Sequence, residues 1–419
     1  PRRRGGRGPV TAPQPAPARE AAEGESRPAR PRRALVLALG LVIALGILLR
    51  LSSWFGTELW LDEYHSLLVA EAPDLDGVLG LVAADPHPPL YWVVLHLVLR
   101  LLGSDPLVAR GLSFMLGVAT LLLATSVALR RWGVPAAIVA STVLGGSALA
   151  IRYSAEIRPY AFVAFALLLG VLASQAAVDR PSIRTYLAQA FALALALGLN
   201  FFGVTLLAVG PGLALVRRKG RLVLHQAALA ALAFLAVSPP LVRVATRLPA
   251  EANEYVKAHW EGRTAADALV AVGRDLLPSA RWPAAHGPGA RRTPIDPLLE
   301  GLAVAGALLA AAGASRTARE ERGASERRGD GLAWACALLL GAAAALAFFS
   351  FAVGRPVVTP GRFAASFVPA AALLCGAAAT WRMPGPAGAV VLALVAALNV
   401  GASMGSAEPG IRVDPGRVL

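Results

Sequence analysis

Long apolar runs alternate along the chain with short polar or charged stretches. The runs at residues 34–55, 106–129, 133–151 and 160–178 each reach the length that a helix needs to cross a bilayer. Further runs of this kind lie at 222–240, 297–313, 332–353, 363–380 and 387–404. Together with a paired segment described next, they predict an all-α integral membrane protein with about 11 transmembrane helices.

The paired segment is the apolar stretch at residues 185–216, between two basic patches. As a helix rising 1.5 Å per residue it covers ~48 Å, which is too short for two full crossings and too long for one. We therefore predict a hairpin that turns near Asn200 to Gly203, somewhat below the outer surface. Non-helical backbone is tolerated at such a depth where it lines a wet cavity.

Residues 88–103, "PPLYWVVLHLVLRLLG", have two interpretations. The segment is short and carries His96 and Arg100 on one helical face, so we interpret it as an interfacial or partly sunk helix. The alternative is a short crossing, which reverses the orientation of every later helix. That would place Arg130 and Arg131 outside, against the positive-inside rule.

The distribution of arginines sets the predicted orientation. Residues 1–33 hold nine Arg and three Glu with little to bury, which predicts a disordered basic tail in the cytoplasm. The membrane domain then extends over residues 34–404. Its predicted non-membrane parts are a first outer loop with interfacial helices at 56–105, a second outer loop at 241–296, a charged cytoplasmic loop at 314–331 and a short outer tail at 405–419.

Composition supports a membrane location. Hydrophobic residues make up 56% of the chain and charged residues only 16%, less charge than a soluble domain of this size carries. The net charge of +14 is therefore assigned to loops that set orientation, and no nucleic-acid partner is expected. The bias toward Ala, Arg, Gly and Leu is typical of a GC-rich bacterium. These features predict a multi-pass protein of a bacterial inner membrane.

The outer segments of this topology share a particular chemistry. Two acids, Asp62 and Glu63, follow the first apolar run within a few residues. The polar side chains predicted outside are Asp62, Glu63, Asp85, His87, Arg152, Tyr153, Glu156, Arg158, Tyr160, Arg355 and Arg362. Guanidinium groups bind phosphate oxygens in a bidentate manner, and a carboxylate can accept a proton. The set therefore favours a site that binds a phosphate and activates a hydroxyl.

Four short motifs occur in order along the chain: "WLDEYHSLL", "ADPHPPLYW", "RYSAEIRPY" and "GRF". In this order and on this topology they resemble the GT-C-type membrane glycosyltransferases. The resemblance is to the bacterial branch similar to protein O-mannosyltransferases and the lipid A aminoarabinose transferase, and it covers residues 34–404. Where that family usually has Arg-Tyr before a late span, this chain has Arg362-Phe363, which keeps the charge but not the phenolic hydroxyl.

The resemblance implies an enzyme that moves a sugar from a polyprenyl-phosphate donor in the membrane lipid to a hydroxyl of a glycan, lipid or protein acceptor outside. A single displacement with inversion needs one base and a cationic clamp on the leaving phosphate. Asp62 is the expected base, with Glu63 and Asp85 in the catalytic group. The expected substrate-binding residues are His87, Arg152, Tyr153, Glu156, Arg158, Tyr160 and Arg362.

Several of these residues also have a simpler interpretation. Asp62 can be a helix cap or a solvated loop acid, and Glu63 can support the structure or contact sugar. Asp85 and His87 can cap the helix that follows them. Arg152 and Arg158 can be interfacial anchors, although they lie on the side that the charge bias disfavours.

Two other classes of protein stay open, as does the need for a metal. A transporter or flippase of lipid-linked sugars is also a bundle of many spans, but it is expected to carry charges near the middle of the membrane. A non-catalytic assembly subunit needs no acidic pair. Mg²⁺ or Mn²⁺ can bind the carboxylates through oxygen, and the arginines can do the same charge work.

Overall fold

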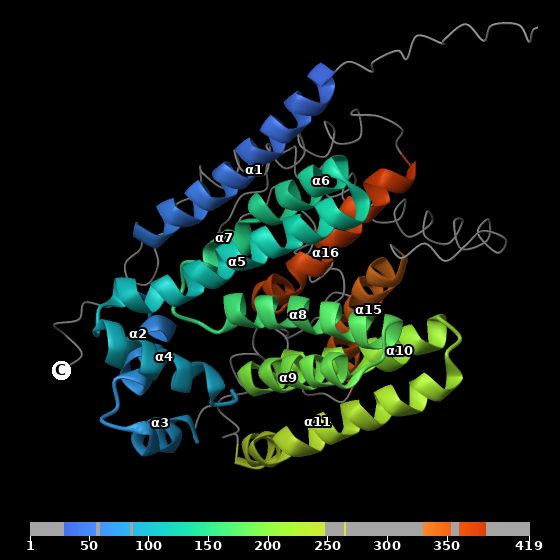
Figure 1. Cartoon of the computed structure of the whole chain (residues 1–419). Coiled ribbons are helices and arrows are strands. Elements are labelled where there is room, and N and C mark those ends of the chain that lie inside the picture. The colour runs from blue at the N-terminus through green and yellow to red at the C-terminus, as the bar shows by residue number, and fades with distance from the viewer. Residues whose placement is uncertain are drawn as a thin grey trace, which may run out of the picture.

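The computed structural model describes residues 29–55, 59–83, 87–247, 264, 330–352 and 360–382, and the regular structure within these ranges is helical. Figure 1 shows the arrangement. The helices are α1 (Ala29–Phe55), α2 (Leu61–Ala70), α3 (Leu75–Val82), α4 (Leu90–Leu102), α5 (Pro106–Trp132), α6 (Val134–Gly145), α7 (Ala148–Tyr153), α8 (Tyr160–Asp179), α9 (Ile183–Leu199), the 3₁₀ helix η1 (Phe201–Ala208), α10 (Val209–Val216), α11 (Gly220–Arg247), α15 (Asp330–Ala352) and α16 (Pro360–Arg382).

Five of the described helices contain a stretch long and apolar enough to cross a membrane. These stretches are Arg33–Phe55, Pro106–Trp132, Tyr160–Asp179, Gly220–Pro239 and Gly331–Phe348. The predicted all-α membrane fold is thereby confirmed, and the chain is a multi-pass membrane protein. The count of 11 stays a prediction, because the apolar runs at 297–313 and 387–404 lie outside the described residues.

The helices form two packed groups. In the first, α6 packs against α1, α5 and α16. In the second, α9 packs against α8 and α11, and α15 packs against α8 and α10 (Figure 1). Helix α8 also packs against α5 and α16, which joins the groups. Nearly every residue of α6 is buried, and most are small, which lets helices approach closely where apolar burial gives little driving force. Thr125 and Ser141 add a hydrogen bond of 2.7 Å between α5 and α6.

Helices α1 and α6 meet at glycines and are fastened by a buried arginine. A Cβ on Gly46 would lie 3.0 Å from the Cα of Gly145, so even an alanine at position 46 would be tightly packed at this crossing. Arg50 of α1 donates from Nη2 to Leu144 O at 2.9 Å and from Nη1 to Gly145 O at 3.2 Å. These are carbonyls of the last turn of α6, which carry the negative end of its dipole.

The chain breaks directly after this contact, because Ser147 caps the new helix α7. We predicted one continuous run over residues 133–151, and that expectation is wrong in this respect. The local cause is the sequence Gly145-Gly146-Ser147, in which two glycines weaken the helix and a serine offers an N-cap. After the break, the chain continues toward the end of the bundle at which α1 ends and α2 begins.

The segment at 185–216 turns where the sequence indicates. Helix α9 ends at Leu199, Asn200 is extended, and its side chain accepts a hydrogen bond from Phe202 N at 3.0 Å. The chain then folds back so closely that a Cβ on Gly203 would lie 2.5 Å from the backbone of Ala196. The next helix differs from expectation. We expected it to end at residue 240, but α11 continues through Pro239 and Pro240 to Arg247. Proline removes one backbone hydrogen bond and can bend a helix without ending it.

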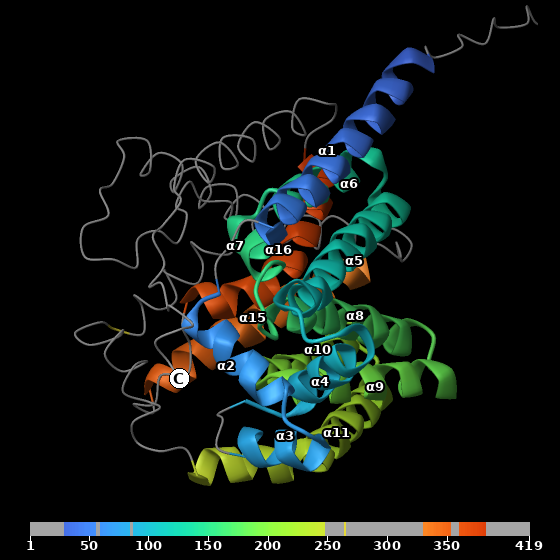
Figure 2. The same ribbon diagram turned by 90° about the vertical axis from the view of Figure 1, so that its left-hand side faces the viewer.

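Helices α2, α3 and α4 gather at one end of the bundle (Figure 2). In α4, Tyr91, Trp92 and Leu95 are buried, whereas Leu101 and Leu102 are strongly exposed. Its 13 residues cover ~20 Å, less than the hydrocarbon thickness of ~30 Å. This length fits the interfacial interpretation of residues 88–103, which stays a prediction.

Candidate functional site

Four segments distant in sequence meet at the end of the bundle where α2 begins. They are the first turns of α2 and α16, the second turn of α5, and the connection from α7 to α8. Ion pairs and hydrogen bonds join Asp62 to Arg362, Glu63 to Arg110, and Glu63 to the backbone of Ile157. The end of α1, which leads into α2, and the start of α5 therefore lie at the same end of the bundle.

Asp62 faces arginines from two other segments. Arg362 donates from Nη2 to Asp62 Oδ2 at 2.7 Å, and Arg158 Nη2 lies 3.7 Å from the same oxygen. The Asp62 side chain keeps 26% of its surface exposed, and Arg362 keeps 24%, so molecules from outside can reach both. Arg158 is buried at 6% exposure and thus holds a charge below the surface. The structure brings these three predicted site residues together.

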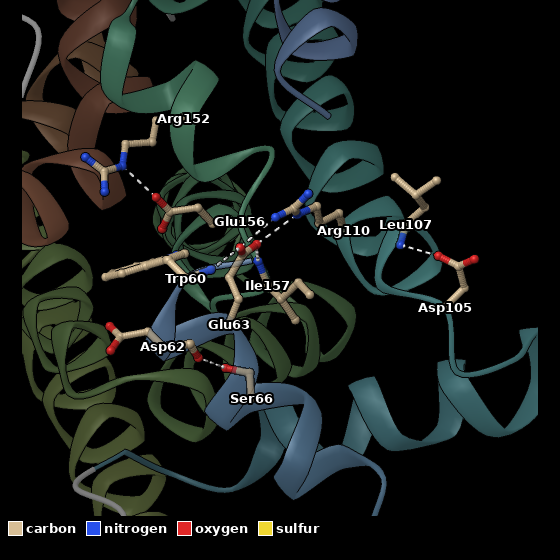
Figure 3. A network of polar contacts seen from close by, with 10 residues as sticks. All are labelled: Trp60, Asp62, Glu63, Ser66, Asp105, Leu107, Arg110, Arg152, Glu156 and Ile157. Carbon is tan, nitrogen blue, oxygen red and sulfur yellow. Dashed lines mark hydrogen bonds and ion pairs between the residues drawn. The ribbon is translucent and has the colours of Figure 1, made fainter. Parts of the chain in front are cut away.

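Glu63 has a different environment although it is the next residue. It is 1% exposed and binds the Arg110 guanidinium through both oxygens, at 2.9 and 2.7 Å. It also accepts from Ile157 N at 3.0 Å and from Trp60 N at 3.4 Å. Figure 3 shows the two carboxylates pointing in different directions. This pattern of contacts places Glu63 among the groups that hold the site together.

The local backbone at the acidic pair is helical. Both acids lie in the first turn of α2, where successive side chains point about 100° apart. Trp60 is the N-cap residue, so Asp62 is not the cap, and a carboxylate in a first turn is favoured by the helix dipole.

Arg152 and Glu156 form an ion pair beside the Asp62 contacts. Arg152 Nε lies 2.5 Å from Glu156 Oε1, and the Glu156 side chain is only 10% exposed. Burial raises the pKa of Glu156 above its ordinary value, and the Arg152 charge works in the opposite direction. The second carboxylate oxygen of Glu156 is buried and has no hydrogen-bond partner among the described residues. Two of the predicted substrate-binding residues are thus in contact with each other.

Trp60 connects the Arg152 ion pair with the Asp62 contacts. The Arg152 guanidinium carbon lies 5.9 Å from the centre of the indole, and that of Arg362 lies 5.6 Å from it. In Figure 3 the Trp60 ring lies between Asp62 and Arg152. Both distances are within the range of cation–π attraction.

Our sequence reasoning did not include Trp60 or Arg110 among the site residues. A signal for Arg110 was present, because a charged residue near the start of an apolar run requires a partner. Trp60 carried no signal beyond its place beside the acidic pair.

The remaining predicted site residues make other contacts or lie outside the described chain. Tyr153 and Tyr160 pack edge to face with ring centres 4.8 Å apart, and both line a small cavity with room for about one water molecule. The ring of His87 lies 5.9 Å from that of Trp92 on α4. Asp85 and Arg355 fall outside the described residues.

The arrangement of charges does not favour a shared cation. Asp62 and Glu63 are each bound by an arginine, and they point apart. Within the described ranges, no group of three or more His, Cys, Asp and Glu residues could hold a metal ion. What the site can do chemically is to accept a proton at a partly exposed carboxylate and to bind an anion with guanidinium groups.

Comparison with solved structures finds similarity to ArnT from Cupriavidus metallidurans, a lipid A aminoarabinose transferase. The crystal structure bound to undecaprenyl phosphate is 18% identical, covers 84% of this chain and 61% of that chain, and has a TM-score of 0.48. The apo structure is 18% identical, covers 85% and 61%, and has a TM-score of 0.46. The chain thus spans less than two thirds of the length of ArnT.

No protein-family model and no curated protein matches the chain. ArnT is the kind of enzyme that the motifs resemble, but an identity of 18% and TM-scores below 0.5 carry no residue roles to this chain. The function therefore has to follow from the residues of the site.

Proposed function

We propose that the protein is a membrane glycosyltransferase that moves a sugar from a polyprenyl phosphate to a hydroxyl of an acceptor on the outer face. The observation that carries this proposal is the partly exposed carboxylate of Asp62 beside Arg158 and Arg362, at one end of a bundle of apolar helices. A lipid-linked donor needs such a position, because its chain lies in the membrane while its phosphate lies at the surface.

In the proposed reaction Asp62 accepts the proton of the acceptor hydroxyl. The acceptor oxygen forms a bond to the anomeric carbon of the sugar from the side opposite the phosphate, which inverts that carbon. The bond between the anomeric carbon and the phosphate oxygen breaks, and the polyprenyl phosphate leaves with the electron pair. The growing negative charge on the phosphate is met by arginines already in place, the condition under which such groups lower a barrier most.

Arg362 is central to this mechanism because it has two possible anionic partners. It binds Asp62 Oδ2 at 2.7 Å. A donor phosphate would compete for the same guanidinium, and its arrival would release this oxygen of Asp62 for the acceptor hydroxyl. The base would then become available in the same step that brings the donor.

The decisive experiment measures transfer from a synthetic polyprenyl-phosphate sugar by the purified protein in detergent. Asp62→Asn keeps the size of the side chain and removes its proton affinity, so turnover should fall by about 10² to 10⁴. Glu63→Gln should cost less turnover in molecules that remain folded, because Glu63 faces Arg110 and Ile157. Melting temperatures measured in parallel separate loss of chemistry from loss of fold.

Two outcomes would contradict the proposal. Near-normal turnover of a folded Asp62→Asn protein, together with an inactive Asp85→Asn protein, would move the base to Asp85. Full turnover in both variants and in Glu63→Gln would argue against the transferase. Flux of labelled lipid-linked sugar across proteoliposomes would then test a transporter or flippase.

A further inference from the structure

We infer that Trp60 is a positioning residue that holds Arg152 and Arg362 together for binding the phosphate of the lipid donor. This inference rests on the proposed function. It assigns to the indole a role in donor affinity, with no part in the bond-making steps.

The geometry of the ring supports this role. The guanidinium carbons of Arg152 and Arg362 both lie within 6 Å of the same indole centre. The distance between these two carbons therefore cannot exceed the sum of their distances to the ring centre. The cations come from α7 and from the first turn of α16, which are remote in sequence. Trp60 comes from a third segment and lies next to both arginines.

The two positive charges need such a device because they repel each other. Each is partly neutralised by its own acid, Arg152 by Glu156 and Arg362 by Asp62. When a phosphate competes for Arg362, the ion pair between Arg362 and Asp62 is replaced by a contact with the phosphate. The attraction of both arginines to the negative face of the indole persists. The ring therefore keeps both cations in place while their anionic partners change.

The backbone of Trp60 is itself fixed, which makes the ring a stable reference point. Its N–H donates to Glu63 Oε2, and Glu63 is held by Arg110. Trp60 also caps α2, the helix that carries Asp62. The ring is thus tied to the helix that presents the expected base, and through it the arginines are aligned with that base.

The test uses a short-chain polyprenyl phosphate as the probe, and its affinity is measured by native mass spectrometry or equilibrium binding in detergent. Trp60→Leu should weaken binding by roughly tenfold, and Trp60→Phe should lie between this variant and the parent. Fluorinated tryptophans placed at position 60 by nonsense suppression give the sharper measurement. Fluorine withdraws electron density from the ring while hardly changing its shape, so the dissociation constant should rise with each added fluorine.

Trp54 provides the matched control. It lies near the end of α1, stacks on Phe114 with ring centres 5.0 Å apart, and donates to Leu107 O at 3.0 Å. Trp54→Leu removes an indole from the same end of the bundle. It should leave the affinity for the lipid phosphate unchanged after correction for the folded fraction.

The binding measurement separates this inference from the proposed function, because it requires no transfer. A flat fluorotryptophan series, even with a weakened Trp60→Leu protein, would show that the indole only fills space and would overturn the inference. If Trp60→Leu raised the acceptor Michaelis constant and left the affinity for the lipid phosphate unchanged, that result would also overturn the inference. Absence of transfer by the parent protein would contradict the proposed function alone, provided that the fluorine series is graded.

Discussion

Arg362 and Asp62 are separated by 300 residues, yet the arginine Nη2 donates to the aspartate Oδ2 at 2.7 Å. Arg362 lies in the first turn of α16, where a cation is disfavoured by the helix dipole, and that turn contains no acidic residue. An external anion is therefore needed to stabilise it there. Asp62 supplies that anion in this structure, and in the proposed reaction a donor phosphate competes with it.

Substitution of Arg362 should weaken donor binding more than acceptor binding. Arg362→Lys should still impair transfer, because an ammonium group cannot replace a bidentate guanidinium. Arg362→Ala should raise the donor Michaelis constant by roughly tenfold or more, in line with the loss of one charge-assisted contact. Initial rates at varied donor and acceptor concentrations provide the measurement. Unchanged donor constants and turnover in Arg152→Ala, Arg158→Ala and Arg362→Ala would rule out the phosphate clamp.

The pair Glu63 and Arg110 should determine stability more than chemistry. Both side chains are almost fully buried, so removing one leaves the other charge without its partner. Glu63→Gln or Arg110→Gln should each cost about 3–5 kcal/mol of unfolding free energy. The double variant should cost clearly less than the two single changes together, and denaturant unfolding in mixed micelles measures this coupling. Strict additivity would mean that the pair is not coupled.

Glu156 should make stability depend on pH. Because burial raises the pKa of Glu156, the native protein binds its proton more tightly than the unfolded chain does. Relative to Glu156→Gln, the parent protein should lose stability as pH rises above the ordinary value of 4.5, and this loss should level off above the raised native pKa. Melting temperatures of both proteins from about pH 4 to pH 8 show the difference. A parallel course of the two curves would contradict it.

The predicted orientation can be tested with single cysteines in a protein whose Cys336 and Cys375 are replaced by alanine. Asp76, Arg131 and Arg180 are exposed and suit labelling. A membrane-impermeant thiol reagent applied to intact cells should modify a cysteine at position 76 and leave those at 131 and 180 unmodified. Modification at both 76 and 131 would mean that residues 88–103 cross the membrane.

The sequence predicted much of the fold because its signal is repeated over many residues. Apolar runs locate α1, α5, α8 and α15, since composition over a whole span decides whether it enters a membrane. The turn at Asn200 could likewise be predicted, from the length of the apolar run alone. The break after Gly145 was not, because the residues on both sides are equally apolar and the cause is local.

The candidate site was predictable in its members but not in its contacts. The motifs named Asp62, Arg158 and Arg362, which the fold brings together. They could not show that Glu63 turns toward Arg110, because that depends on the rotational position of α2 against α5. The contact of Trp60 with two arginines depends likewise on how three segments approach.

Arg50 has a consequence for how the protein is made. It lies in the apolar stretch of α1, the first of the described helices to leave the ribosome, but its acceptor Gly145 O follows 95 residues later. At ~5–20 residues per second, the nascent chain carries this charge for several seconds before α6 exists. An arginine in a membrane segment raises the cost of insertion, so the first helix enters the bilayer as an incomplete structure. Arg50 Nη1 can donate at once to Gly46 O of its own helix, at 2.9 Å, whereas its acceptors on α6 arrive only later. We therefore expect α1 to reach its final depth in the bilayer when α6 packs against it.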